Sequence, residues 1–227
     1  SEADGIVVVS RGVGTSLSAT AGIPQERIHV IHNPVVLSEL EQKARAIPDH
    51  PWLKQKDFPV ILAAGRLTGA KDYPTLLKAF ALMRRGRSAR LIILGEGEER
   101  KGIEGLIGHL DLDQDVDLAG FQANPYAFMA RADLFVLSSL WEGFGLVLVE
   151  SLACGTPVVS TNCPSGPAEV LEKGKYGPLV PVGDFEALAK AMDAVLDDPL
   201  PSGFLKKRAR EFSLSSICDQ YLDVLLG

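Results

Sequence analysis

The chain has 227 residues, of which 46% are hydrophobic and 23% are charged, and its formal net charge is −6. These proportions are ordinary for a globular protein, and the acidic excess argues against a general nucleic-acid-binding protein. No apolar run approaches the roughly 20 residues of a membrane-spanning helix. The three cysteines and four histidines have no spacing typical of a metal site, which favours a reducing cytoplasm. With no signal peptide and no initial Met, we expect a fragment of a cytoplasmic protein.

The first 58 residues predict a small strand–helix–strand unit followed by a connecting segment. We expect a strand over residues 4–10, a helix over 13–21 and a strand over 27–31, ended by Asn33-Pro34. Residues 37–58 are charged and contain two prolines, so we interpret them as a linker with a short helical stretch at 37–46.

From residue 59 onward, short apolar runs alternate with helical patterns. Such alternation predicts an α/β fold, with a Rossmann-like parallel sheet and helices on both faces. The apolar runs are continuous, as expected for strands buried on both sides. The expected strands are 60–64, 91–94, 116–119, 134–137, 157–160 and 177–180. The expected helices are 73–83, 98–110, 125–131, 145–153, 167–171, 185–196, 205–212 and 215–226.

The loop Gly65-Arg-Leu-Thr-Gly-Ala-Lys71 follows the strand 60–64. Ligands of such folds bind at the carboxyl ends of the strands, where this loop is expected to lie. Arg66 and Lys71 are two cations that suit a diphosphate. The alternative is a solvated loop with two surface charges, which is the commoner case.

Two other motifs are weaker signals. Gly95-Glu-Gly-Glu-Glu-Arg100 resembles a dinucleotide fingerprint, but the third glycine is absent. Asp111-Leu-Asp-Gln-Asp-Val-Asp117 resembles the start of a calcium loop, but it lacks the required glycine and glutamate. We interpret this acidic run as a solvated turn at the amino end of a strand, and we expect no metal.

The stretch Trp141-Glu-Gly-Phe-Gly-Leu-Val-Leu-Val-Glu150 connects an expected strand to an expected helix. Glu142 falls in the turn. Gly143 and Gly145 leave the amides at the helix start accessible, and such a start favours anions.

Glu150 interrupts a helix that is otherwise almost entirely apolar. A buried carboxylate is costly unless hydroxyls or cations satisfy it. The alternatives are that Glu150 lies on a narrow exposed edge or pairs with an internal Arg. Because eight helical residues rise ~12 Å, Glu142 and Glu150 do not suit a glycosidase pair, whose carboxyl groups lie roughly 5–9.5 Å apart.

Glu142 and Glu150 are separated by seven residues, and this spacing resembles the E-x7-E signature of retaining GT-B glycosyltransferases of the family 4 type. The loop with Arg66 and Lys71 is similar to that family's donor-diphosphate loop. Further similarity covers residues 10–33, Gly95 and Ser165-Gly-Pro167, the last resembling a loop of bacterial members that build cell-surface glycans. The alternative for this last segment is a plain helix start with Pro167 at its first position.

The resemblance implies roles for individual residues. Arg66 and Lys71 would stabilise the leaving diphosphate, Glu142 would hold sugar hydroxyls, and Glu150 would hold the ribose. Phe121 would border the nucleobase, although a core role is the alternative. Catalytic residues are therefore expected to be Arg66, Lys71 and Glu142. Donor-binding residues are expected to be Gly65, Gly95, Phe121, Glu142, Gly143, Phe144, Gly145, Leu146 and Glu150. We expect no metal and no cofactor, and a UDP-sugar rather than a GDP-sugar as substrate.

The same resemblance implies the domain organisation. Residues 1–36 would be a remnant of the acceptor domain, 37–58 the linker, and 59–227 the nucleotide-sugar-binding domain of the carboxyl-terminal half. We expect a hexosyl- or N-acetylhexosaminyltransferase of cell-surface polysaccharide biosynthesis. Its acceptor would be a glycan or lipid-linked molecule held by the missing domain, and the full-length protein would sit peripherally at the inner membrane face. The chain alone would be inactive.

Two alternatives remain open from the sequence. The chain could be a fragment that binds a nucleotide sugar without transferring it. An NAD-binding Rossmann domain is the other alternative, although the incomplete glycine fingerprint disfavours it.

Overall fold

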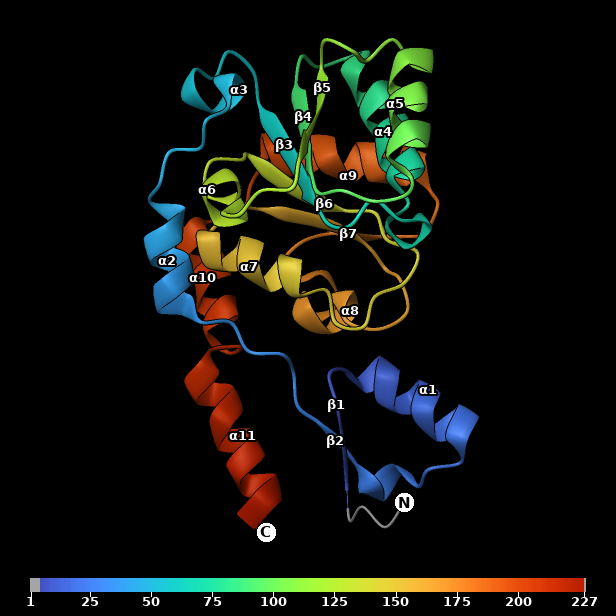
Figure 1. Ribbon diagram of the computed structural model, residues 1–227, viewed down its shortest axis with the longest axis vertical. Coiled ribbons are helices and arrows are strands. Elements are labelled where there is room, and N and C mark those ends of the chain that lie inside the picture. Colours follow the sequence, from blue (N-terminus) through green and yellow to red (C-terminus); the bar gives the residue numbers. More distant parts are fainter. Residues whose placement is uncertain (1–4, 227) are drawn as a thin grey trace.

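The computed structural model describes residues 5–226, which form two parallel sheets of unequal size (Figure 1). The smaller sheet pairs β1 (Ile6–Val8) with β2 (Ile28–Val30), and helix α1 (Arg11–Ala21) connects them. The predicted strand–helix–strand unit is therefore confirmed, although residue 4 of its first strand lies outside the described residues. Residues 1–4 and 227 of the predicted domains lie outside them too.

The larger sheet has six parallel strands in the order β5-β4-β3-β6-β7-β8. From β3 the chain builds outward to β5, and it then returns to pair β6 beside β3. The strand order thus reverses between β3 and β6, which is where ligands of open α/β sheets bind. The strands are β3 (Val60–Ala64), β4 (Arg90–Leu94), β5 (Val116–Gly120), β6 (Leu134–Leu137), β7 (Val158–Thr161) and β8 (Leu179–Val180).

Helices cover both faces of this sheet, as the continuous apolar strands predict. Alternate residues of one strand, such as Ile61 and Leu62, face opposite clusters of buried side chains. One face is covered by α4 (Tyr73–Arg84), α5 (Arg100–His109) and α9 (Phe185–Asp197). The other face is covered by α2 (Leu37–Ala44), α6 (Pro125–Met129), α7 (Leu146–Cys154), α8 (Pro167–Val170) and α10 (Ser202–Arg210).

The segment 37–58 is more closely attached to the larger domain than a plain linker. Helix α2 packs against α6 and α7, and its Leu40 is buried. The short helix α3 (Pro51–Lys54) was not expected from the sequence; the side chain of His50 accepts a hydrogen bond from the Trp52 amide at its start. These contacts join the segment to the core beside β3.

The chain ends in α11 (Leu214–Leu226), which extends away from the six-stranded domain (Figure 1). Its start is capped by Ser213, whose hydroxyl accepts a hydrogen bond from the Ser216 amide at 3.4 Å. Across residues 5–226, no helix combines the length and apolar character needed to cross a bilayer.

Candidate functional site

The candidate site lies where the strand order reverses, at the carboxyl ends of β3 and β6. The loop after β3 ends in a 3-10 turn, Gly69–Lys71, and the loop after β6 carries Glu142. Asp72 follows the turn with a φ of 46° and caps α4 by accepting a hydrogen bond from the Thr75 amide. The chain order of β3 and β6 thus brings two distant loops to one edge of the sheet.

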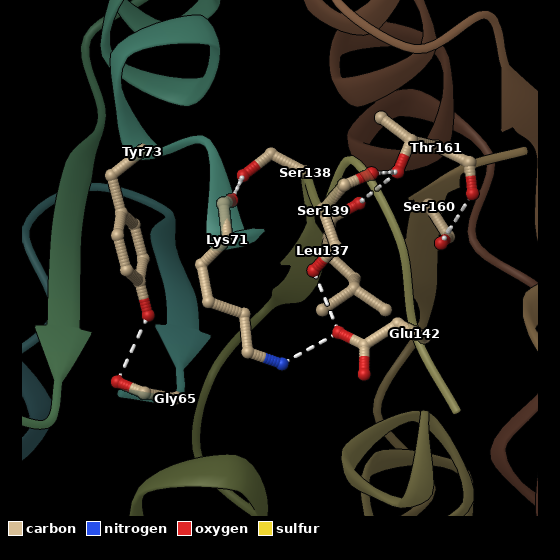
Figure 2. Close-up of polar contacts among 9 residues, drawn as sticks. All are labelled: Gly65, Lys71, Tyr73, Leu137, Ser138, Ser139, Glu142, Ser160 and Thr161. Atoms are coloured by element: carbon tan, nitrogen blue, oxygen red, sulfur yellow. Dashed lines mark hydrogen bonds and ion pairs between the residues drawn. The ribbon is translucent and has the colours of Figure 1, made fainter. Parts of the chain in front are cut away.

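Lys71 and Glu142 form an ion pair at this edge (Figure 2). The Lys71 Nζ lies 2.5 Å from the Glu142 Oε1, and both side chains are largely buried, with 19% and 12% of their surface exposed. Ser139 donates a second hydrogen bond to the same carboxylate oxygen at 2.7 Å. Both residues were predicted to serve the site, and the structure brings them into contact.

Buried hydroxyl groups hold the two loops in place (Figure 2). Ser138 donates to the carbonyl of Lys71 at 2.7 Å, and Thr161 donates to the carbonyl of Ser139 at 2.6 Å. The side chains of Ser138, Ser139 and Thr161 are all buried. This network was not predicted from the sequence. Two serines directly after a buried apolar strand are nevertheless a detectable signal, because buried hydroxyls need partners.

Gly65 and Gly95 let the loops after β3 and β4 pack against each other. A Cβ atom on Gly95 would lie 2.0 Å from the Gly65 carbonyl oxygen, and the φ of Gly95 is 133°. The Tyr73 hydroxyl donates to that same carbonyl at 3.1 Å. Burial, followed by the charge of Glu142, raises the pKa of Tyr73. The need for glycine at position 95 is therefore explained by loop packing.

Arg66 stands apart from the Lys71–Glu142 pair. Its side chain is 76% exposed and lies 3.7 Å from the Glu98 carboxylate. A surface ion pair at this distance holds a side chain only weakly, so the guanidinium is free to reorient toward an anion.

The glycine loop Gly143–Gly145 precedes α7. Gly145 is the N-cap residue, with a φ of 81°, and within residues 5–226 no side chain caps this helix start. Leu146 is half-buried at its first position. The helix start therefore retains the electrostatic character that attracts anions.

The expectation for Phe144 needs correction. Its side chain is 3% exposed. It stacks on His32 with ring centroids 4.8 Å apart and contacts Phe212 edge-on at 5.6 Å. The apolar ring is therefore part of the core, and it does not face a donor. Phe121 shows the reverse: its side chain is 77% exposed, so the alternative of a core role is wrong.

Glu150 lies inside α7, as predicted, and is half-buried. Its partner is the Tyr126 hydroxyl, which donates at 3.0 Å, and not an internal Arg. Burial raises the pKa of Glu150, and the hydrogen bond from Tyr126 partly opposes that effect. Burial, followed by the charge of Glu150, raises the pKa of Tyr126 to about 12.

The acidic run 111–117 is not the plain solvated turn that the sequence suggested. Asp115 is 9% exposed and pairs with Arg84, at 2.5 Å, and with Arg90. Asp117 lies 3.0 Å from His50. These carboxylates sit at the amino end of β5, where they join the strand to neighbouring elements through ion pairs.

The segment Ser165-Gly-Pro167 begins α8, and Gly166 is its N-cap residue. Within the described part of the chain, no side chain caps this helix, and Pro167 is its first residue, as in the plain helix start that the sequence allows. A Cβ atom on Gly166 would lie 2.1 Å from the Phe144 carbonyl oxygen. This segment therefore packs tightly against the glycine loop.

Comparison with known proteins places the chain in a family. Residues 47–212 match the family model described as glycosyl transferases group 1. The N-acetylgalactosamine-N,N'-diacetylbacillosaminyl-diphospho-undecaprenol 4-alpha-N-acetylgalactosaminyltransferase of Campylobacter jejuni is 34% identical over 230 residues, covering 100% of this chain and 61% of the relative. The lipopolysaccharide core biosynthesis glycosyltransferase LpsE of Rhizobium meliloti is 35% identical over 206 residues, covering 88% and 58%. The chain thus spans about three fifths of the length of these relatives.

Solved structures share the fold. A glycosyltransferase from Rickettsia africae superimposes with a TM-score of 0.86 at 21% identity, covering 97% of this chain and 62% of that one. HepE of Anabaena in complex with UDP gives a TM-score of 0.83 at 25% identity, covering 98% and 64%. The parallel sheet, its helices and the sequence match agree: the chain belongs to the glycosyl transferases group 1 family and carries the Rossmann-like carboxyl-terminal half of its GT-B fold.

Proposed function

We propose that this chain is the donor-binding part of a retaining glycosyltransferase of the family 4 type, which moves a hexosyl or N-acetylhexosaminyl group from a nucleotide diphosphate sugar to an acceptor hydroxyl. The observation that carries the proposal is the Lys71–Glu142 pair at the reversal of strand order. A cation and a carboxylate held side by side suit a ligand that carries both a diphosphate and sugar hydroxyls.

Each part of the donor has a candidate partner. Lys71, Arg66 and the start of α7 would stabilise the diphosphate as its negative charge develops. Glu142 would accept hydrogen bonds from sugar hydroxyls, and Glu150 from those of the ribose. Gly65 and Gly95 would border the donor through their backbone, and Phe121 would lie beside the base.

Transfer would break the bond between the anomeric carbon and the leaving diphosphate oxygen and form a bond from that carbon to the acceptor oxygen. The acceptor's proton would pass to the donor phosphate, with no nucleophile supplied by the protein. We expect no metal ion or cofactor, because two cations and a helix start already oppose the phosphate charge. Donor binding should therefore be unchanged by EDTA; dependence on Mn²⁺ or Mg²⁺ would contradict this.

The comparisons favour a UDP-sugar and an acceptor in cell-surface glycan synthesis. HepE was crystallised with UDP, the name of the Campylobacter jejuni relative includes a diphospho-undecaprenol acceptor, and that of the Rhizobium meliloti relative refers to lipopolysaccharide core biosynthesis. We propose that a glycan or lipid-linked acceptor binds an amino-terminal domain that completes the protein, at the inner membrane face. Residues 1–36 would then belong to that acceptor domain, residues 37–58 would be the linker, and the chain alone would bind the donor without transferring its sugar.

Calorimetry with UDP-sugars, GDP-sugars and NAD tests the proposal. We expect UDP-sugars to bind one per chain and NAD not to bind. Arg66→Ala should weaken nucleotide binding about fivefold (~1 kcal/mol) and leave the melting temperature unchanged, because the side chain is exposed. Binding of NAD alone would favour the dinucleotide alternative. Sugar transfer by this chain alone would show that the missing domain is not required.

A further inference from the structure

Helix α1 contacts the six-stranded domain through its first residues. The Glu169 carboxylate accepts hydrogen bonds from the backbone amides of Arg11, at 2.9 Å, and Gly12, at 3.2 Å. The Ser10 hydroxyl donates to the Gly143 carbonyl at 2.7 Å, and Ser10 is fully buried. The start of α1 is thus attached both to α8 and to the glycine loop beside Glu142.

The Glu169 contact is an unusual form of helix cap. The first amides of a helix have no partner within it, and a nearby carboxylate is favoured by the helix dipole. Such a carboxylate usually comes from the helix itself, whereas Glu169 lies 158 positions from Arg11 along the chain. Ser10 supplies the local cap by accepting from the Val13 amide at 3.2 Å. Glu169 therefore adds a second cap from the neighbouring domain.

The two surfaces fit so closely that a glycine is required. A Cβ atom on Gly12 would lie 2.7 Å from the Ser165 Cα atom, closer than real contacts allow. Glycine within a helix weakens it relative to alanine. Gly12 therefore allows α1 to lie close to residues 165–169, although it makes the helix itself less stable.

Glu169 is itself fixed from the other side by α10. Arg208 is 8% exposed and donates hydrogen bonds to the carbonyls of Glu169, at 2.7 Å, and Val170, at 2.9 Å. The backbone that carries the carboxylate is therefore bonded to α10, and Glu169 links this part of α8 to α1.

We propose that Glu169 is a positioning residue that holds the amino-terminal unit against the glycine loop, so that docking of α1 and binding of the donor nucleotide stabilise each other. The coupling passes through Gly143, whose carbonyl is bonded to Ser10 and whose neighbour Glu142 pairs with Lys71. Such coupling is reciprocal, because each event favours the same arrangement of the loop. The inference rests on the proposed function for its ligand, but the contact itself can be tested alone.

Amide hydrogen exchange, resolved by NMR on this chain, tests the contact. In Glu169→Ala, the amides of Arg11 and Gly12 should exchange about tenfold faster, because each loses a charge-assisted hydrogen bond. Glu169→Gln keeps one acceptor oxygen and should give an intermediate rate. Glu186→Gln, which removes an exposed carboxylate from the first turn of α9, is the matched control and should leave both rates unchanged.

A second variant separates docking from helix stability. Gly12→Ala should strengthen an isolated α1 but block its approach to Ser165. We expect the Arg11 amide to lose protection in this variant as well. Unchanged exchange at Arg11 in both Glu169→Ala and Gly12→Ala would overturn the proposed docking contact.

The coupling is tested by adding UDP to the same samples. In the wild type, saturating UDP should slow exchange at Arg11 and Gly12 about threefold or more, and this response should be absent in Glu169→Ala. If UDP binds without changing these rates in the wild type, Glu169 is only a structural cap and the coupling is wrong. If calorimetry shows that no nucleotide diphosphate binds, the proposed function and the coupling fail, while the exchange rates without UDP still decide the docking contact.

Discussion

Glu142 and Glu150, the two carboxylates of the E-x7-E pattern, occupy contrasting surroundings. Glu142 is paired with a cation, Lys71, and receives a further hydrogen bond from Ser139. Glu150 has a neutral partner, Tyr126, and burial raises its pKa. The turn after β6 is therefore stabilised by its charged groups, whereas α7 holds a carboxylate at some cost to the stability of the fold.

Lys71→Met should cause the largest loss of stability, because it leaves the Glu142 carboxylate without its cation. Breaking a fully buried pair costs ~3–5 kcal/mol. Because water reaches both side chains, we expect about 2 kcal/mol of lost unfolding free energy, or roughly 5 °C in melting temperature. Chemical denaturation measures the loss, and adding Glu142→Gln should restore most of it. If Lys71→Met alone were as stable as the wild type, the ion pair would not stabilise the turn.

Glu150→Leu, unlike Lys71→Met, should not lower the stability of the fold. Removing a buried carboxylate with a neutral partner should leave stability unchanged or raise it by up to about 1 kcal/mol at neutral pH. Nucleotide affinity should fall about tenfold (~1.4 kcal/mol) if Glu150 binds the ribose. Thermal melting and calorimetry on the same variant measure the two quantities. Loss of stability with affinity retained would contradict a ribose role.

The difference in stability between Glu150→Leu and the wild type should depend on pH, because the pKa of Glu150 is raised in the folded state. Between its ordinary pKa of 4.5 and the raised folded value, the folded state binds more protons than the unfolded state. The stability contributed by protonated Glu150 is therefore present below pH 4.5 and is lost as the pH rises through the folded pKa. The stability gain of Glu150→Leu should consequently grow with rising pH. A gain that shrinks over this range would mean that the pKa is not raised.

Tyr126→Phe is the smallest change, since it removes a single hydroxyl from the surroundings of Glu150. The hydrogen bond from Tyr126 lowers the pKa of Glu150, so its loss should raise that pKa further. We expect a destabilisation of about 1 kcal/mol when Glu150 is ionised and a smaller one when it is protonated. Urea unfolding at several pH values measures this, with Tyr221→Phe on α11 as the control. A pH-independent effect would mean that the hydroxyl acts without Glu150.

The sequence predicted the main architecture because each signal was local. Continuous apolar runs predicted the six parallel strands, and the helix predicted over residues 145–153 is observed as α7, Leu146–Cys154. The sequence also predicted that Lys71 and Glu142 serve one site, since each follows a strand at its carboxyl end. Which strands are neighbours cannot be obtained from such patterns, yet that order brings the two side chains together.

Predictions failed where long-range packing decides. Phe144 lies in a predicted donor-binding loop, but its ring is buried by His32 and Phe212 from distant segments. Asp115 belongs to an acidic run that looks solvated, but Arg84 and Arg90 pair with it. In both cases the partners are far away in sequence, and only the folded chain brings them into contact.

In the proposed function, Lys71 forms part of the diphosphate site where the strand order reverses. Calorimetric titration of UDP into Lys71→Met/Glu142→Gln tests it most directly, because this double variant removes both charges without leaving one orphaned. Lys78→Met, which alters an exposed residue of α4, is the control. We expect the double variant to keep its melting temperature within about 2 °C and to lose UDP affinity by more than about tenfold. UDP affinity within about threefold of the wild type would contradict it.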